Sequence, residues 1–253
     1  MNITSLPSAL YTEVLFRPLL NLLVGVTNVL PGHSVGWAII AVTIIVRLVL
    51  LPSFLHQATA MRKNQEKMKQ VQGRLDELKR KHKDDKAKQA EETMKVYREA
   101  GINPASGCLP LIVQLPVLIA LYQVFFSGLT PEIYHYLYSF VEKPTSLSFL
   151  FLGVNLSTPS LVIGVIAGVF QFIQMKYLAP QQQSQPAGNE EAAKMMASMQ
   201  KNMTYIFPAM TIFIALRLPA ALALYWTVST LFGIAQQIIV KKTLHLEANP
   251  PNI

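Results

Sequence analysis

The chain has 253 residues, of which 51% are hydrophobic and 14% are charged, and its mean hydropathy is +0.33. Because soluble domains contain about 25% charged residues, this composition indicates a membrane protein. The single cysteine, Cys108, excludes an intramolecular disulfide and a cysteine-rich metal site.

The N-terminal segment, residues 1–36, is predicted to lie outside the cytoplasm. Its stretch 9–30 (ALYTEVLFRPLLNLLVGVTNVL) is apolar but contains Glu13, Arg17 and Pro18. These residues favour an amphipathic helix that lies on the outer surface of the membrane. A sixth membrane span, or a poor signal anchor, over the same stretch is the alternative.

Further along the chain, several stretches are apolar enough to cross a bilayer, which takes about 20 mainly apolar residues. The last of them, 203–240, would form a single helix about 57 Å long, which far exceeds the bilayer core. Pro219 in the triplet RLP disfavours helix at the residue before it and divides this stretch in two. The sequence therefore predicts five transmembrane helices: 37–55, 108–127, 159–178, 203–216 and 219–240.

The connecting segments differ in basic charge. Segment 56–104 contains thirteen Lys and Arg residues and loop 128–158 contains one, whereas loop 179–202 and the tail 241–253 contain two each. Basic loops remain in the cytoplasm. We therefore predict an outer N-terminus, an outer loop 128–158 and a cytoplasmic C-terminus, with most of the net charge of +8 on the cytoplasmic segment 56–104.

This basic segment carries two apolar patterns of helical spacing. A polar stretch (KRKHKDDK) separates them, in which Asp84 or Asp85 could cap a second helix, and Gly101 would end that helix. The patterns predict an antiparallel helical hairpin that projects into the cytoplasm. Its two apolar seams are Met61, Met68, Val71, Leu75 and Leu78 on the first helix and Ala87, Ala90, Met94 and Tyr97 on the second.

Arg47 lies near the middle of the first predicted span. A charge at this depth normally faces protein or water and pairs with another group, but the other four spans contain no Asp or Glu. We therefore expect a partly hydrated cavity in which Arg47 meets neutral polar side chains and can attract an acidic guest. The alternative is that the polar residues only join helix to helix. The candidates are Thr43, Gln114, Gln123, Gln171, Gln174, Thr204, Thr211, Tyr225, Thr227, Ser229, Gln236 and Gln237.

The sequence contains no grouping typical of an enzyme. Ser/His/Asp arrangements, metal-ligand spacings and Gly-rich phosphate loops are absent, so we expect no catalytic residue, no metal and no cofactor. Proton-coupled transporters use carboxylates or histidines within the membrane, and the spans offer neither.

Four stretches together resemble the YidC-type membrane protein insertases, in particular the bacterial branch of that family. They are IIVRLVLLP (44–52), the stretch 96–125 that includes REAGINPASGCLPLIVQLPV, FQFIQMKY (170–177) and LPAALALYWTVSTLFGIAQQ (218–237). The resemblance implies five core helices around a hydrophilic groove that is closed to the outside, a multi-pass protein of the bacterial plasma (inner) membrane, and insertion and folding of membrane proteins, alone or with the Sec translocon.

The resemblance also implies roles for particular residues. Arg47, Gln174, Tyr225 and Trp226 would form the substrate-binding groove, and the hairpin 56–100 would recruit nascent chains. The implied partners are nascent membrane proteins with short, often acidic, translocated tails, together with the lipid bilayer, and the Sec translocon and ribosome as further candidates. Neither specific nucleic-acid binding nor an oligomer is expected.

Two features depart from the family pattern. Arg217 occupies the predicted outer turn between the last two spans, where a neutral residue is more usual, and the tail after Lys242 is short, which argues against strong ribosome binding through it. Two other functions stay open at this point: a small-solute channel or transporter, and an assembly chaperone without insertase activity.

Overall fold

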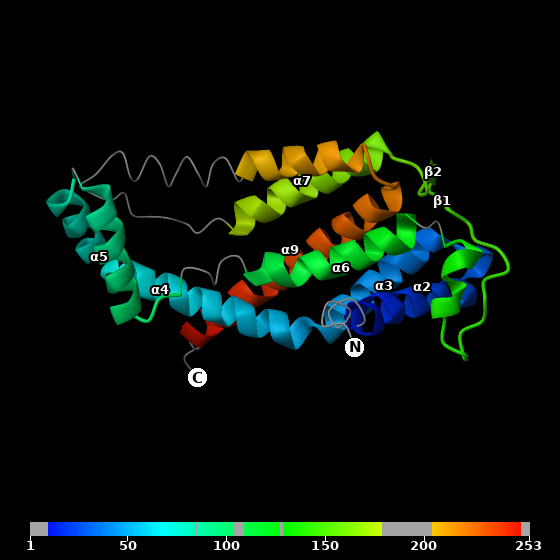
Figure 1. The fold of residues 1–253 in the computed structure, drawn as a ribbon, viewed down its shortest axis with the longest axis horizontal. Helices are drawn as coiled ribbons and strands as arrows, with labels where there is room; N and C mark the ends of the chain where they lie inside the picture. The colour runs from blue at the N-terminus through cyan, green and yellow to red at the C-terminus, as the bar shows by residue number, and fades with distance from the viewer. Residues whose placement is uncertain (1–9, 84, 104–108, 127–128, 179–203, 249–253) are drawn as a thin grey trace, which may run out of the picture.

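The computed structural model describes residues 10–83, 85–103, 109–126, 129–178 and 204–248, and these are mostly helical (Figure 1). A body of helices occupies most of the molecule. A helical hairpin projects from one end, called here the hairpin end, and residues 129–158 cover the opposite end, called the loop end. The all-α class predicted from the sequence agrees with this architecture, apart from one small pair of strands at the loop end.

The N-terminal helix begins with a π-helical turn, η2 (Thr12–Phe16), which continues into α2 (Arg17–Val29). Leu19, Leu20, Leu23 and Val24 repeat at helical spacing and are buried, so α2 is amphipathic, as predicted. The helix packs on α3 (Val35–Val49) and also touches α6 (Leu109–Phe126). A short 3₁₀ turn, η3 (Pro31–His33), joins α2 to α3.

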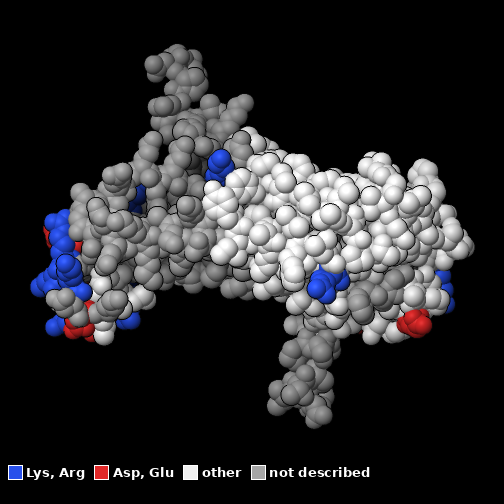
Figure 2. Space-filling view, turned by 90° about the horizontal axis from the view of Figure 1, so that it is seen from above, with Lys and Arg blue, Asp and Glu red and all other residues white. Residues whose placement is uncertain are grey.

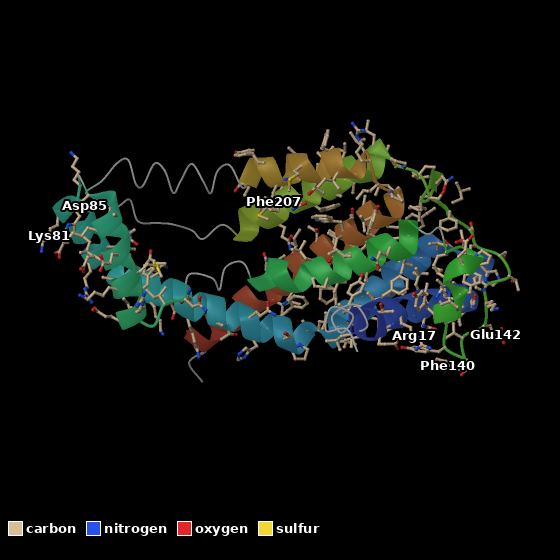
Figure 3. All side chains as sticks on the ribbon, in the orientation of Figure 1. Arg17, Lys81, Asp85, Phe140, Glu142 and Phe207 are labelled. Atoms are coloured by element: carbon tan, nitrogen blue, oxygen red, sulfur yellow. The ribbon has the colours of Figure 1, made fainter. Side chains whose placement is uncertain are left out.

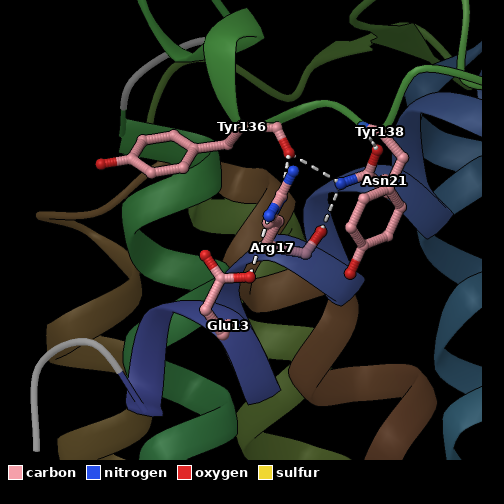
Figure 4. A network of polar contacts seen from close by, with 5 residues as sticks. All are labelled: Glu13, Arg17, Asn21, Tyr136 and Tyr138. Carbon is pink, nitrogen blue, oxygen red and sulfur yellow. Dashed lines mark hydrogen bonds and ion pairs between the residues drawn. The ribbon is translucent and has the colours of Figure 1, made fainter. Parts of the chain in front are cut away.

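A polar network ties α2 to the loop that follows α6 (Figure 4). The carbonyl of Tyr136 accepts hydrogen bonds from Arg17 Nε and Asn21 Nδ2, both at 3.0 Å, and Asn21 Oδ1 accepts from the backbone N–H of Tyr138 at 2.6 Å. Arg17 also pairs with Glu13 at 2.9 Å. Exposed ion pairs contribute little, so the buried Asn21, with both amide atoms bonded, is the main anchor of this loop.

Residues 37–55, expected to form one span, are divided by a bend. Helix α3 ends at Val49, α4 (Leu51–Lys81) begins two residues later, and the two axes differ by 57°. Pro52 lies in the first turn of α4. Because proline has no N–H, it cannot donate to the carbonyl of Leu48, and its ring crowds that carbonyl. The helix expected over 37–55 is therefore broken at Leu50, and the first helix of the projecting hairpin begins at Leu51 rather than at residue 56.

The projecting hairpin consists of α4 and α5 (Lys86–Glu99). Asp85 caps α5, because its carboxylate accepts a hydrogen bond from the N–H of Lys88 at 3.0 Å. The seam predicted on α4 is present at Met68, Val71, Leu75 and Leu78. The side chain of Met61, its first predicted member, lies outside the described part of the structure. The seam predicted on α5 is wrong, because only its last residue, Tyr97, joins the hairpin core. Ala87, Ala90 and Met94 are exposed, and the core is completed by Val96, Ala100 and Ile102.

Gly101 ends α5 with a φ of +61°, and the N–H groups of Gly101 and Ile102 bond back to the carbonyls of Arg98 and Tyr97. These two backbone hydrogen bonds form a Schellman cap, which requires the left-handed conformation at Gly101. Gly101→Ala is expected to weaken the hairpin by about 1 kcal/mol. Hydrogen exchange of the α5 amides in the full protein measures this loss.

Gly73, in the middle of α4, provides the matched control. A Cβ built on Gly73 meets nothing within 4 Å. Gly73→Ala is therefore expected to stabilise the hairpin by about 1 kcal/mol through helix propensity, and so to slow hydrogen exchange of its amides. Equal effects of the two substitutions would contradict the assignment of the cap.

The remaining helices are α6, α7 (Leu161–Leu178), the helix Thr204–Ala215 and α9 (Ala220–Ala248). The structure places a turn between the last two, at the triplet RLP, and α9 continues eight residues beyond the span predicted to end at 240. Of the predicted bounds 108–127 and 203–216, residues 108, 127 and 203 lie outside the described part of the chain, as does the loop 179–202.

Length and composition single out few of these helices as membrane spans. Among the described residues, Ala220–Ile239 of α9 is long and apolar enough to cross a bilayer, and the bent pair α3–α4 is a second candidate if it counts as one span. Three further apolar helices are shorter: Leu115–Phe125, Leu161–Lys176 and Thr204–Ala215.

A two-stranded hairpin, β1 (Leu150–Phe151) and β2 (Val154–Asn155), was not predicted. It turns at Leu152 and Gly153, both with positive φ, as tight hairpins require. Leucine is an unusual residue at a position of positive φ, and for this reason the residue types did not predict a turn there. The segment that leads into β1 is fixed to the start of α3, because Val35 N–H donates to the carbonyl of Ser148 at 2.9 Å.

Charge is distributed unevenly over the molecule. Figure 2 shows Lys and Arg, with some Asp and Glu, gathered on the α4–α5 hairpin, whereas the described part of the helical body is mostly uncharged on this face. Figure 3 places Lys81 and Asp85 at the hairpin end and Phe140 and Glu142 at the loop end.

Candidate functional site

Arg47, in the last turn of α3, has defined partners from two other helices. Its Nε donates a hydrogen bond to Ser229 Oγ of α9 at 3.0 Å, and Nη2 bonds to the same hydroxyl. On its other side, Cζ lies 4.9 Å from the centre of the Phe54 ring in α4. The guanidinium thus connects α3, α4 and α9. The sequence predicted neutral polar partners for Arg47, and Ser229 was one of the candidates.

Arg47 lies at one end of an apolar depression. A pocket beside it is lined by Thr43, Val46, Arg47, Leu50, Phe54, Val117 and Tyr225. It shares four of these residues with a second pocket, whose other lining residues are the apolar Leu19, Leu23, Ile39, Val42, Leu121 and Phe125. Thr43 bonds its own helix, donating to the carbonyl of Ile39 at 2.6 Å. Arg47 is therefore the one charged residue in the lining of these two pockets. Its attraction for an anion is screened less among apolar side chains than in water.

Three of the four predicted site residues meet at one face of α9: Tyr225 belongs to this face, and Arg47 and Gln174 reach it from α3 and α7. Tyr225, Ser229 and Gly233 follow at intervals of four and so lie on the same face of the helix. Tyr225 is buried and lines both pockets, and Ser229 holds Arg47. Gln174 of α7 reaches the same face one turn further on, where a Cβ on Gly233 would lie 2.4 Å from Gln174 Nε2. The side chains of Arg47 and Gln174 thus meet α9 on adjacent turns.

Trp226, the fourth predicted site residue, is placed differently. It is half-buried and lines neither of the two pockets at Arg47. One residue along a helix turns the side chain by about 100°, so Trp226 and Tyr225 point in different directions. The two aromatic residues therefore do not act at one point of this pocket.

Of the residues that contact Arg47, Phe54 was not singled out from the sequence, and Ser229 was one of twelve polar candidates. The interval of four residues between Tyr225 and Ser229 could have selected Ser229, because it places both on one face. Phe54 follows Arg47 by seven residues, an interval that returns to the same face of a straight helix. The bend at Leu50 lies between them, and the sequence pattern does not set its direction.

The hairpin 56–100 offers a second predicted functional surface. The basic side chains that the structure describes there are exposed and interspersed with acidic ones, and one pair, Arg74 and Glu99, forms a 2.8 Å ion pair between α4 and α5. For metal binding, the described residues contain no group of three or more His, Cys, Asp or Glu side chains placed to hold an ion.

Comparison with known proteins identifies the family. A family model described as "60Kd inner membrane protein" matches residues 26–247. The membrane protein insertase YidC of Fusobacterium nucleatum is 35% identical over 232 residues, which cover 92% of this chain and 98% of that protein. The insertase MisCB of Bacillus subtilis is 37% identical over 93% of this chain and 81% of its own length. The insertase YidC of Clostridium tetani is 34% identical over 86% and 85% of the two chains. These matches confirm the resemblance, and the chain belongs to the family of the 60Kd inner membrane protein.

Proposed function

We propose that this protein is a membrane protein insertase of the bacterial plasma membrane, which inserts membrane proteins and assists their folding. The observation that carries the proposal is the half-buried Arg47 at the end of an apolar pocket, held by a neutral hydroxyl of α9. Relatives of similar length are named membrane protein insertases, which supports the same function.

The mechanism follows from the charge of this pocket. An acidic tail of a nascent membrane protein enters the space between the helices, where Arg47 attracts it. Tyr225 of α9 and Gln174 of α7, which packs on the same face of α9, lie beside it. The apolar segment of the guest then leaves sideways, past α7 and α9, into lipid. A carboxylate binds a guanidinium through paired, charge-assisted hydrogen bonds, which exceed in strength the bond to a neutral hydroxyl. The guest can therefore replace Ser229 as the partner of Arg47.

The proposed arrangement in the membrane has five core helices: α3, α6, α7, the helix Thr204–Ala215 and α9. The loop end faces outward and the hairpin end faces the cytoplasm, as the basic residues of the hairpin favour. Four of the core helices, all except α9, are shorter than the about 20 residues that a typical bilayer requires, and short helices thin the bilayer locally. A thinner bilayer lowers the barrier that a translocated tail must cross.

Nascent chains are the proposed substrates, and the basic hairpin is their proposed first contact. The Sec translocon and the ribosome are proposed as accessory partners. The protein would act as a monomer, without a cofactor and without catalysing a covalent reaction.

Reconstitution tests this function directly. The purified protein is placed in liposomes, a single-span substrate with an acidic tail is synthesised in their presence, and protection of the tail from external protease is measured. Protection that depends on the protein is expected. Solute flux without tail protection would instead identify a channel or transporter, and improved folding of substrates already inserted, without tail protection, would identify an assembly chaperone.

A further inference from the structure

The bend between α3 and α4 and the Arg47 pocket form a single unit. Arg47 belongs to the last turn before the bend, Phe54 follows it in α4, and both line the same pocket together with Leu50, at which α3 gives way to α4. The guanidinium lies 4.9 Å from the Phe54 ring and bonds Ser229 of α9. One side chain thus connects the two arms of the bend to the helical body.

The part of the chain beyond the bend is built as one rigid piece. Asn64 in α4 donates to the carbonyl of Asn103 at 2.8 Å and accepts from its N–H at 3.0 Å. Lys67 donates to the carbonyl of Gly101 at 3.0 Å. Because the two helices also share a buried apolar core, α4 and α5 move together. A change of angle at the bend therefore moves the whole hairpin.

The bend is also the weakest point of the long helical path from α3 to α4. Pro52 removes one backbone hydrogen bond there, and the remaining bonds across the break include Leu50 N–H to Val46 O and Phe54 N–H to Leu50 O, at 3.0 and 3.1 Å. Side-chain contacts across the break therefore have a large influence on its angle. The Arg47–Phe54 contact is the one that also responds to the charge in the pocket, since a cation lies over the ring face.

We infer that Phe54 is a positioning residue that holds Arg47 in its resting place and couples the pocket to the orientation of the α4–α5 hairpin. When a carboxylate binds the guanidinium, the side chain turns toward it, the contact with Phe54 is lost and the angle at the bend changes. The resting contact requires no substrate. The release by a guest rests on the proposed function, and the two parts are tested separately.

The first experiment measures hairpin orientation without substrate. Spin labels are placed at the exposed positions Lys95 in α5 and Val169 in α7, in a Cys108→Ser background, and the distance distribution is recorded by pulsed electron resonance in nanodiscs. Phe54→Leu keeps an apolar side chain but removes the ring, and it is expected to shift or broaden the distribution. Phe54→Tyr keeps the ring and should match the parent.

Two further variants separate coupling from a general loss of structure. Arg47→Gln is expected to change the distribution at least as much as Phe54→Leu, because it also removes the bonds to Ser229. Adding Phe54→Leu to Arg47→Gln should cause no further change, because the Arg47–Phe54 contact is already absent. Phe213→Leu removes a similar arginine–aromatic contact, with Arg217 at 5.7 Å, far from the bend, and should leave the distribution unchanged. A parental distribution in Phe54→Leu, or additive changes in the double variant, would overturn the inference.

The second experiment adds a guest. A single-span peptide with an acidic tail is expected to move the parental distribution toward that of Phe54→Leu, and the same peptide with Asn and Gln in its tail should not. If the substrate-free differences are present but the acidic peptide has no effect, release by a guest is wrong, although Phe54 still positions Arg47. Absence of insertion in the liposome assay, with the spin-label differences intact, would instead refute the proposed function.

Discussion

Arg47→Glu is expected to reduce the insertion of a substrate with an acidic tail by at least about tenfold. A hydrogen bond to a charged group contributes about 1.5–3 kcal/mol, which corresponds to roughly 10- to 100-fold in an equilibrium or rate. Reversal of the charge also adds repulsion between the carboxylate and the tail. Arg47→Gln should fall below the parent, and Arg47→Lys should lie between, because lysine keeps the charge but not the paired geometry of the guanidinium.

The measurement is tail protection in liposomes, with two controls that isolate the charge. A substrate in which the acidic residues of the tail are replaced by their amides should lose most of its sensitivity to Arg47. Arg217→Gln removes an arginine from the exposed turn after the helix Thr204–Ala215 and should leave insertion near the parental rate. Normal insertion of acidic tails by the Gln and Glu variants would refute the electrostatic part of the mechanism.

Gly36→Ala is expected to give the largest loss of stability among the glycine substitutions. A Cβ on Gly36 would lie 2.3 Å from Cδ2, 2.5 Å from Cγ and 2.7 Å from Cβ of Phe151. Phe151 is buried and lies edge-on to Trp37 at 5.2 Å. It follows Ser148, whose carbonyl accepts a backbone hydrogen bond from Val35 of α3. Neither α3 at Gly36 nor the Phe151 side chain can move away without loss of these contacts. Overpacking of this kind costs about 1–3 kcal/mol.

Thermal unfolding in nanodiscs measures the effect, and two variants define its cause. Gly25→Ala in α2 introduces a Cβ with no atom within 4 Å, so it should stabilise the protein by about 0.5–1 kcal/mol through helix propensity. In a Phe151→Ala background, Gly36→Ala should cost much less than in the parent. Equal destabilisation in both backgrounds would show that the clash is not the cause.

Local features were predictable from the sequence because their signals are local. Asp85 caps α5 and Gly101 ends it, since capping depends on residue types within one turn. The division of 203–240 followed from Pro219, which restricts the residue before it. The bend at Leu50 could have been predicted in the same way from Pro52, but the apolar character of 37–55 favoured a single span. The strand pair was not predicted because its turn contains Leu152, a residue type that does not indicate a turn.

The faces that meet between helices were less predictable. Ala87, Ala90 and Met94 have the spacing of a seam, yet only the last turn of α5 packs on α4, and Ile102, beyond the helix, completes the core. Spacing gives the residues that share a face, but not the length over which two helices stay in contact. The same limit applies to the predicted pair Tyr225 and Trp226, of which only Tyr225 lines the pocket beside Arg47.

The sequence by itself determined the family, the helical class, the basic hairpin and the presence of an arginine among apolar residues, because each of these depends on composition and short-range order. Only the tertiary structure decided the surroundings of that arginine. Ser229 is 182 residues away along the chain, and Phe54 reaches the guanidinium across a bend. Such contacts depend on the relative rotation and crossing of helices, which the packing of all side chains sets together and no local pattern specifies.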